Sequence, residues 1–493
     1  MPRPSRSTPV TTAPPQRPVV VPDATLLVRR ATYGATPDLL AQVRSIGVEA
    51  WLRRQLAPSE IDDAACDAVL ARLEGLDWDV PTAHAKLAHR DNTWFLMENV
   101  VRGAVVRAAW SNRQLEQVMV DVWSNHLNVT CPSDNATDNR QHYDAVIRRH
   151  AFGRYADLLK ATIKHPSMIR YLNNESSSKT APNENLGREL LELHTVGVEA
   201  GYTEADVRTS ARILTGLSID WPTGAMRYRP TWHWTGHVSV LGFSHPNADA
   251  DGSAVLDAYL THLARLPATA RRIATKLAVR FVADDPSRAL IDDLASVYLA
   301  NDTAITPVLW RLFHSPEFAS SAGRKLRRPY EDLIATLRAL GLGPDAKGID
   351  GIKALAWITG DLGDAPYGWP TPDGYHDVAV GWRSPAGTLN RWNTHMSLAA
   401  NWWPKSLTRA PLLQLLGTPL PTTYGGLMDT LAARLLQQPL TSGQRQALCV
   451  FLRDQWNPTI GPSTPLPANA QALGWRLPYL VALVLDSPQF AVR

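Results

Sequence analysis

The segment NENLGRELLELHTVG, which begins at Asn183, concentrates side chains that could do chemistry. If Asn183 caps a helix, a turn of about 100° per residue places Asn185, Arg188, Glu189 and Glu192 on one face. The two carboxylates then converge, and they could share a divalent metal ion, share a proton, or be neutralised by Arg188 and other partners. We therefore predict either a catalytic or metal-binding face here, or an ion-paired structural network.

The histidine of this segment does not belong to that face. On a regular helix His194 lies about 200° from Glu192, so the triplet Glu-Leu-His cannot converge on one ion as ligands four residues apart do. The leucines Leu186, Leu190 and Leu193 form the predicted core face instead.

A second candidate is the segment LEQVMVDVWSNHLNV. Apolar residues at helical spacing from Leu115 place His126 on the apolar stripe of its helix. A histidine in that position is more often a hydrogen-bonded core residue than a metal ligand. Asp121 and Asn125 form a polar pair beside it, which suits a site at an interface between helices.

A third candidate is the loop segment TWHWTGHVSVLGFSH, which contains His233, His237 and His245. Imidazoles in a loop could complete a carboxylate site contributed by helices. Packing of histidines among the neighbouring tryptophans is the competing explanation. Nucleotide-binding glycine motifs and a GxSxG nucleophile elbow are absent from the sequence.

Two classes of function follow from these candidates. The first is an enzyme with a divalent metal ion at its active site. The metal would be bound by His126, Glu189, Glu192 and His233, and Asn125 and Arg188 would orient or neutralise a substrate. Its metal-free variant uses Glu189 or Glu192 as a general base. Hydrolysis or transfer on a sugar-like or other polar substrate would suit the tryptophans at 369 and 382. The second class is a non-catalytic helical scaffold whose tryptophan-rich loops contact a partner protein.

The elements that must position these residues are mainly helices. In ATPDLLAQVRSIG, Thr36 is a predicted N-cap, Pro37 occupies the first helical position and Gly47 ends the helix. The segment YTEADVRT contains a capping box. Strand signals are scarce and are best in HVSVLGF. We predict a large, mainly α multi-helix protein with a small irregular or β insertion near 218–252.

The organisation expected along the chain has four parts. Residues 1–24 are rich in Pro, Ser and Thr and are predicted to be disordered. A main helical domain, 25–341, carries the candidate site. A long Pro- and Gly-rich loop region, 342–392, follows, because GDAPYGWPTPDGY contains too many helix breakers. A helical part, 393–493, is expected to pack on the main domain.

Composition and charge argue against nucleic-acid binding, disulfides, a thiolate zinc site and a transmembrane segment. The chain has 50 basic and 46 acidic residues and a formal net charge of +4, without a basic run that could follow a phosphate backbone, so we expect no nucleic acid. The three cysteines are widely separated and indicate neither disulfides nor thiolate zinc. No transmembrane segment and no secretory signal is predicted. The sequence as it stands indicates a cytoplasmic protein, or an envelope or secreted one if a leader is missing.

Several segments together resemble one family. LLVRRATYGATPDLLAQVRSIGVEAWLRRQL, VMVDVWSNHLNV, HPSMIRYLNN, NENLGRELLELHTVGVEAGYTEADVRTSARILTG, HLARLPATARRIATKLAVRFVADDP, LFHSPEF, PYGWPTPDGY and the final SPQF are similar, in this order, to the large bacterial family catalogued as domain-of-unknown-function eighteen hundred. The resemblance covers about residue 25 to 493.

The resemblance implies no established activity. It implies an envelope or secreted location for many members, and a possible partner with a phosphatase- or sulfatase-like fold encoded nearby. The polar signature positions of the family that match this chain are Asn125, His126, Asn183, Glu184, Asn185, Arg188, Glu189, Glu192 and His194. His233 also matches by spacing. Trp234 and Val238 stand where the family often has Asp and Lys, so this chain departs from the family pattern in the histidine loop.

Overall fold

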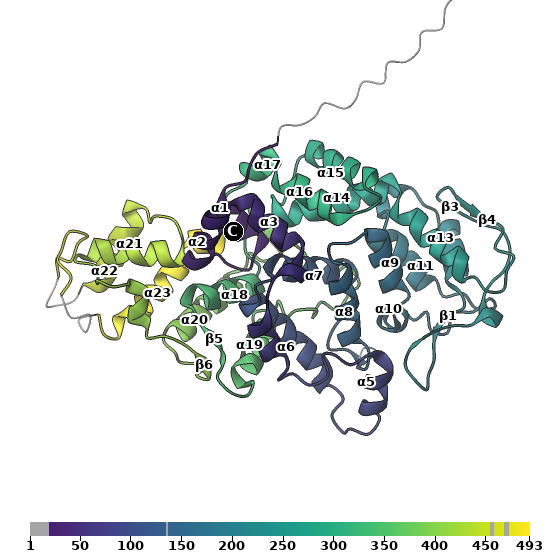
Figure 1. Ribbon diagram of the computed structural model, residues 1–493, viewed down its shortest axis with the longest axis horizontal. Helices are drawn as coiled ribbons and strands as arrows, with labels where there is room; N and C mark the ends of the chain where they lie inside the picture. The colour runs from purple at the N-terminus through teal and green to yellow at the C-terminus, as the bar shows by residue number, and fades with distance from the viewer. Residues whose placement is uncertain (1–18, 135–136, 454–457, 468–472) are drawn as a thin grey trace, which may run out of the picture.

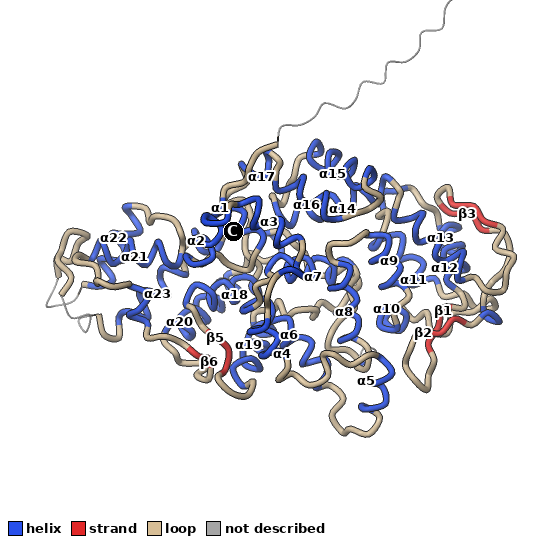
Figure 2. The backbone as a smooth tube through the Cα atoms, viewed as in Figure 1, coloured by secondary structure: helices blue, strands red, loops and turns tan. Residues whose placement is uncertain are grey.

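The computed structural model describes residues 19–134, 137–453, 458–467 and 473–493. In this part of the chain the protein is mainly α-helical, with three small two-stranded sheets (Figures 1 and 2). The predicted fold class is therefore confirmed. The predicted disorder of residues 1–24 lies mostly outside the described residues, and the first helix begins at Ala24 with Asp23 as its N-cap.

The helices of the first half of the chain build the centre of the molecule and contribute to the side, at the right in the view, that carries two of the three small sheets (Figure 1). They are α1 (Ala24–Ala31), α2 (Pro37–Ile46), α3 (Val48–Leu56), α4 (Ala64–Leu70), α5 (Val80–Leu87), α6 (Phe95–Trp110), α7 (Gln114–His126), α8 (Arg140–His150), α9 (Tyr155–Ile163), α10 (Pro166–Tyr171), α11 (Glu184–Glu189) and α12 (Glu204–Leu214). A π-helical turn, η3 (Leu190–His194), continues α11, and a 3-10 turn, η4 (Val198–Ala200), follows it.

The helices of the second half return across the centre and end in a lobe formed by α21 to α23 (Figure 1). They are α13 (Ser253–Ala264), α14 (Pro267–Phe281), α15 (Arg288–Ala300), α16 (Ile305–Phe313), α17 (Pro316–Ala319), α18 (Pro329–Leu340), α19 (Asp350–Asp361), α20 (Pro385–Ala399), α21 (Tyr424–Leu435), α22 (Ser442–Leu452), α23 (Arg476–Leu485) and α24 (Pro488–Ala491). Among the described residues no helix is long and apolar enough to cross a membrane.

Local sequence signals set several helix ends as predicted. Thr36 caps α2 by accepting from the Leu39 amide, and Gly47 ends it at φ +89°, a conformation that glycine adopts without strain. Thr203 and Asp206 form the capping box of α12. Asn183 caps α11 by accepting from the Asn185 amide.

The strands lie mainly where the sequence predicted the β insertion. β1 (Leu217–Ile219) pairs antiparallel with β2 (Met226–Tyr228), and β3 (Val238–Val240) pairs antiparallel with β4 (Phe243–His245). Val238 and Val240 are fully buried, which explains the alternation in HVSVLGF. A third pair joins β5 (Gly343–Asp345) to β6 (Leu407–Thr408).

The predicted loop region 342–392 contains helix α19 and the beginning of α20, so it is not loop throughout. Ile352, Leu355 and Ile358 recur at helical spacing and are buried, so packing outweighs the low helix propensity of the glycines near both helix ends. The prolines and glycines that prevent helix formation lie after α19, and residues 362–378 contain neither helix nor strand.

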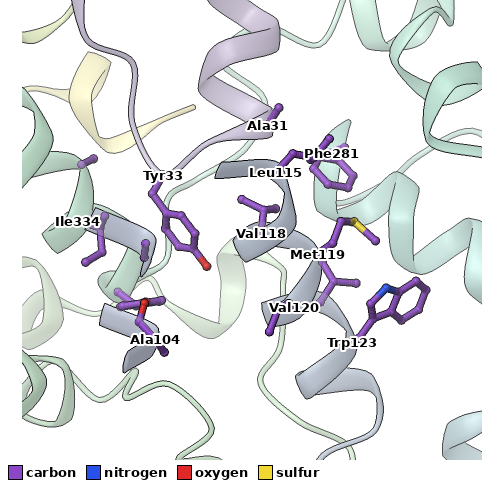
Figure 3. Packing of buried hydrophobic residues seen from close by; sticks show 14 of the residues in the cluster. Ala31, Tyr33, Ala104, Leu115, Val118, Met119, Val120, Trp123, Phe281 and Ile334 are labelled. Atoms are coloured by element: carbon purple, nitrogen blue, oxygen red, sulfur yellow. The ribbon is translucent and has the colours of Figure 1, made fainter. Parts of the chain in front are cut away.

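The core is one large cluster that runs from Leu26 to Phe490, with two small satellite clusters beside it. Helix α7 passes through its centre. Figure 3 shows Leu115 and Met119 of α7 beside Phe281 of α14, with Tyr33 and Ile334 on the other side. Because α7 is packed on all sides, its polar C-terminal residues must find partners inside the protein.

Candidate ligand-binding pocket

The predicted histidines of α7 and η3 lie together in a closed hydrogen-bonded circuit. His126 Nε2 lies 2.8 Å from the Tyr155 hydroxyl, and that hydroxyl donates to the carbonyl oxygen of His194. His194 Nδ1 in turn lies 2.9 Å from the carbonyl oxygen of His126. Because the Tyr155 hydroxyl donates its proton to the His194 carbonyl oxygen, the hydroxyl oxygen must accept a hydrogen bond from His126 Nε2. His126 is therefore assigned the tautomer with a proton on Nε2.

Both imidazoles of this circuit are neutral at pH 7. Burial lowers the pKa of His194 to about 4. Burial, with the cations Lys276 and Arg272 adding to it, also holds the pKa of His126 well below its ordinary value. His126 is 2% exposed and His194 is fully buried. The circuit therefore fixes the register of α7 against η3, as expected of hydrogen-bonded core histidines.

The π-helical turn separates the two polar residues of Glu-Leu-His. Glu192 accepts a hydrogen bond of 2.7 Å from the Tyr202 hydroxyl, whereas His194 faces the core. The wider π turn also differs from the regular helix that we expected, because Leu191 is fully buried and Leu193 is only partly buried. Turns of this kind are frequent at functional sites.

The predicted carboxylate face is only partly assembled. Glu189 is half-buried, and its pKa is raised first by burial and then by the nearby carboxylates Glu192 and Asp373. Arg188 instead makes two hydrogen bonds of 2.8 and 2.7 Å to Glu204 of α12. The Arg188 guanidinium therefore joins α11 to α12, and its Nη1 and Nη2 donors are already used on Glu204.

Asn125 joins α7 to the glycine-rich loop. Its Oδ1 accepts from the Tyr375 amide at 3.1 Å, and its Nδ2 donates to the Asp121 carbonyl oxygen at 2.9 Å. Asn128 Nδ2 donates to the carbonyl oxygens of Trp369 and Thr371 at 3.0 and 2.7 Å. Two segments about 250 residues apart, SNHLN and PYGWPTPDGY, are thereby held together.

The four predicted metal ligands are not brought together. His233 is buried beside the small sheets, with Nδ1 3.0 Å from the Thr215 carbonyl oxygen and Nε2 2.9 Å from Asn247 Oδ1. His126 is held by Tyr155. Among the residues that the structure describes, no three His, Cys, Asp or Glu side chains are placed to hold a metal ion.

The structure places a pocket of about 880 Å³ next to these segments. Its wall is formed by α14, α15, residues 196–200 and the loop residues 373–377. Arg272 and Lys276 of α14 line it, one helical turn apart. We did not predict these two residues, although the cations of TARRIATKLAVR recur four residues apart, a spacing that is unfavourable for like charges without partners.

Lys276 has neither an ion pair nor a hydrogen bond among the described residues, and Arg272 donates only to the Leu193 carbonyl oxygen, at 3.0 Å. Four carboxylates also line the pocket: Glu199, Asp292, Asp373 and Asp377. Asp292 lies 3.0 Å from Arg271, Asp377 lies 3.3 Å from Lys325, and Asp373 accepts hydrogen bonds from Trp369 and Thr371. Burial, with Arg272 adding to it, lowers the pKa of Lys276 to about 8.

A buried ionic network lies behind the loop wall of the pocket. Arg280 contacts Glu331 at 2.6 Å and Asp377 at 3.6 Å, and the C-terminal Arg493 contacts Glu331 at 3.3 Å. Asp377 is ion-paired with Arg280 and Lys325 and does not form an ion pair with Lys276. Asp377 and Asp373 still raise the pKa of Lys276, but less than burial and Arg272 lower it.

No curated protein and no solved structure matches this chain. One family model does, and it covers residues 26–492, nearly the whole chain. The matched residues include α7, η3, α14 and the loop at 373–377, which together form the pocket and its support. The chain belongs to the family described as Protein of unknown function (DUF1800).

Proposed function

We propose that this protein is an enzyme that binds a polar substrate in the pocket between α14 and the 373–377 loop and holds an anionic group of it on Arg272 and Lys276. The observation that carries the proposal is the unpaired state of these two neighbouring cations in the described structure. Buried charges in proteins are normally paired. Two adjacent partly buried cations without a carboxylate in direct ion-pair contact are suited to receive a ligand anion.

The chemistry proposed is metal-free hydrolysis or group transfer. Glu189 does not line the pocket itself, but Asp373 of the pocket wall is close enough to help raise its pKa, and a raised pKa suits proton transfer. It is our candidate general acid–base. Trp369 and Trp382 lie against Tyr375 of the pocket, with ring centroids 5.1 and 5.7 Å away, and offer faces for a sugar ring. A sugar carrying a carboxylate or phosphate is therefore the preferred substrate class.

The test is the binding of glucuronate and glucose 6-phosphate, measured by calorimetry. The wild type should bind one of them, and Lys276→Met and Arg272→Gln should each weaken binding roughly tenfold or more. Lys347→Met, which removes an exposed lysine that does not line the pocket, is the matched control. Equal affinities in all variants would contradict the anion site.

Catalysis requires a separate readout from binding. Glu189→Gln should keep the affinity for a bound sugar acid or sugar phosphate and abolish turnover of its glycosides or esters. Unchanged turnover in this variant would remove Glu189 from the mechanism.

A second candidate function is a binding partner of another protein, such as the phosphatase- or sulfatase-like protein that the family resemblance implies. It is favoured by exposed tryptophans, since Trp357 and Trp475 are 64% and 67% exposed. Trp357 also contacts Trp403 edge to face, with centroids 5.6 Å apart. Trp357→Ser should weaken association with that purified partner, as measured by analytical ultracentrifugation.

A further inference from the structure

Lys276 presents a primary amine to the pocket on α14. Its side chain lines the pocket and is partly exposed, and its Nζ is not one of the side-chain nitrogens that are buried without a partner. Lys325, by contrast, is 1% exposed and lies 2.6 Å from Asp284. Ile273 and Leu277 of α14 are fully buried and fix the position of the helix. The Lys276 amine is therefore held in place and is accessible from the pocket.

Arg272 precedes Lys276 by one helical turn and lines the same pocket. Its Nε donates to the Leu193 carbonyl oxygen, whereas its Nη1 and Nη2 make no hydrogen bond among the described residues and are not fully buried. Side chains four residues apart on a helix are neighbours, with Cβ atoms about 5–6 Å apart. A small ligand that contacts both side chains must therefore carry the two groups that they recognise within a few atoms of each other.

The groups around Lys276 leave part of its amine unprotonated at neutral pH. Burial and Arg272 lower its pKa to about 8, against the smaller opposite effects of the loop carboxylates Asp377 and Asp373. About one tenth of Lys276 is then neutral at pH 7, against less than about one in a thousand for a lysine of ordinary pKa. A neutral lysine amine is a nucleophile toward a carbonyl carbon.

We infer that Lys276 is a carbonyl-reactive lysine that captures a short 2-oxo acid as an imine, with the carboxylate of this ligand held by Arg272. The carbonyl follows from the accessible amine, and the adjacent carboxylate follows from the single helical turn between the two side chains. Only the role of Arg272 as an anion site rests on the proposed function. A 2-oxo sugar acid belongs to the substrate class proposed above and carries both groups.

The capture step exchanges a carbonyl oxygen for nitrogen without oxidation or reduction. The lone pair of Lys276 Nζ adds to the carbonyl carbon, the electron pair of the C=O π bond moves to oxygen, and a proton passes from nitrogen to that oxygen. The nitrogen lone pair then forms the C=N bond while the hydroxyl group takes a second proton and leaves as water, which gives the protonated imine. His376 lines the same pocket and can carry these protons.

Reductive trapping on the full chain tests the inference. Glyoxylate with sodium cyanoborohydride at pH 7 converts an imine to a stable carboxymethylated lysine, and peptide mapping by mass spectrometry measures the rate at each lysine. Lys276 should be modified at least about tenfold faster than the exposed Lys347, because a larger fraction of its amine is neutral. Lys276→Arg should abolish the fast modification, and Lys347→Arg should retain it. A rate at Lys276 that is no higher than the rate at Lys347 overturns the inference.

Acetaldehyde, which has a carbonyl but no carboxylate, isolates the role of Arg272. Loss of Arg272 also raises the pKa of Lys276, so Arg272→Gln should slow both reactions at Lys276. It should slow the trapping of glyoxylate roughly tenfold more than that of acetaldehyde, because only glyoxylate loses an ion pair. Equal slowing of the two reactions would overturn the assignment of a 2-oxo acid.

The reactive lysine and the proposed function can fail separately. Calorimetric binding of glucuronate or glucose 6-phosphate without fast trapping at Lys276 would retain the anion site and remove the imine. Fast trapping at Lys276 without binding of either sugar would retain the reactive lysine and remove the proposed substrate class.

Discussion

At the scale of single residues, Lys276 differs from neighbouring cations of α14 because it forms no ion pair among the described residues. Arg271, on the same helix, is paired with Asp292, and Arg280 is paired with Glu331. Lys276 has Arg272 as its nearest charged neighbour on α14, and burial lowers its pKa to about 8. The native protein without a ligand therefore carries an unfavourable charge at neutral pH.

The first prediction concerns the stability of the ligand-free protein. Replacing Lys276 by Met should raise the free energy of unfolding at pH 7 by roughly 1–3 kcal/mol, because an unpaired partly buried cation is removed. The pKa of Lys276 is lowered from 10.5 to about 8 in the native state, so the unfolded chain holds more protons between these values. The stability of the wild type relative to the variant should therefore rise as pH increases from 8 to 10.5.

Urea unfolding monitored at several pH values checks this. Lys347→Met, on an exposed loop, is the control and should follow the wild type at every pH. A Lys276→Met protein that is less stable than the wild type at pH 7 would show that Lys276 has a stabilising partner.

The second prediction follows from the same residue and concerns anion affinity. Since the Lys276 ammonium loses its proton near pH 8, the affinity for a bound sugar acid should fall as pH rises through this value. In Lys276→Arg the fall should be absent, because guanidinium stays protonated there. Calorimetric titrations at pH 6.5, 8 and 9.5 measure the difference.

At the scale of elements, the position of the pocket depends on how the loop 362–378 meets the end of α7. Gly374 lies at φ +72°, and a Cβ atom there would collide with the carbonyl oxygen of Asn125. The amide of the next residue, Tyr375, donates to the Asn125 side chain. The loop therefore reaches the pocket only because a residue without a side chain lies on the helix end.

The third prediction is that Gly374→Ala destabilises the protein by roughly 2–4 kcal/mol and weakens ligand binding, because the added methyl group forces the loop away from α7. Gly348→Ala separates this collision from backbone strain, since Gly348 has φ +73° but no atom within 4 Å of a Cβ at that position. The control should cost only about 1 kcal/mol. Equal losses in urea unfolding would mean that the close approach to Asn125 is unimportant.

At the scale of the whole molecule, buried ionic contacts connect parts of the chain that are far apart in sequence. His395 of α20 lies between two carboxylates, 2.8 Å from Asp332 of α18 and 2.8 Å from Asp486 next to α23. Burial alone would lower the pKa of His395, but these two carboxylates raise it to about 9. The C-terminal helices are thus joined to α18 by a histidine that is charged at neutral pH.

The fourth prediction is a pH-dependent loss of stability. A pKa that is raised from 6.5 to about 9 in the native state contributes stability that is fully present below pH 6.5 and is lost as pH rises through 9. The contribution should be about 3 kcal/mol. Thermal unfolding at pH 6.5 and 9.5 should show this loss in the wild type, a much smaller loss in His395→Gln, and the wild-type loss in His89→Gln, which removes an exposed histidine.

Much of the fold follows from short-range signals in the sequence. The caps at Thr36, Thr203 and Asn183, and the alternation around Val238, act within a few residues, so they could be read before any tertiary contact was known. The mainly α class and the place of the β insertion were predicted correctly for this reason. Helix α19 was not predicted because the loop inferred from GDAPYGWPTPDGY was extended back over the helical periodicity of Ile352, Leu355 and Ile358, which precede that segment.

The sequence by itself determined which helices form and which residues carry charge, because these properties are local. The tertiary structure alone decided which charges are already paired. Arg188 and Glu189 were predicted on one helix face, yet Arg188 is paired with Glu204 of α12, whereas Glu189 lies near the carboxylates Glu192 and Asp373, which raise its pKa together with burial. Nothing in the local sequence distinguishes Lys276 from the other cations of α14, and its lack of an ion pair in the described structure arises from contacts between α14 and a loop about 100 residues away. Pairing depends on such long-range contacts, and no local pattern encodes them.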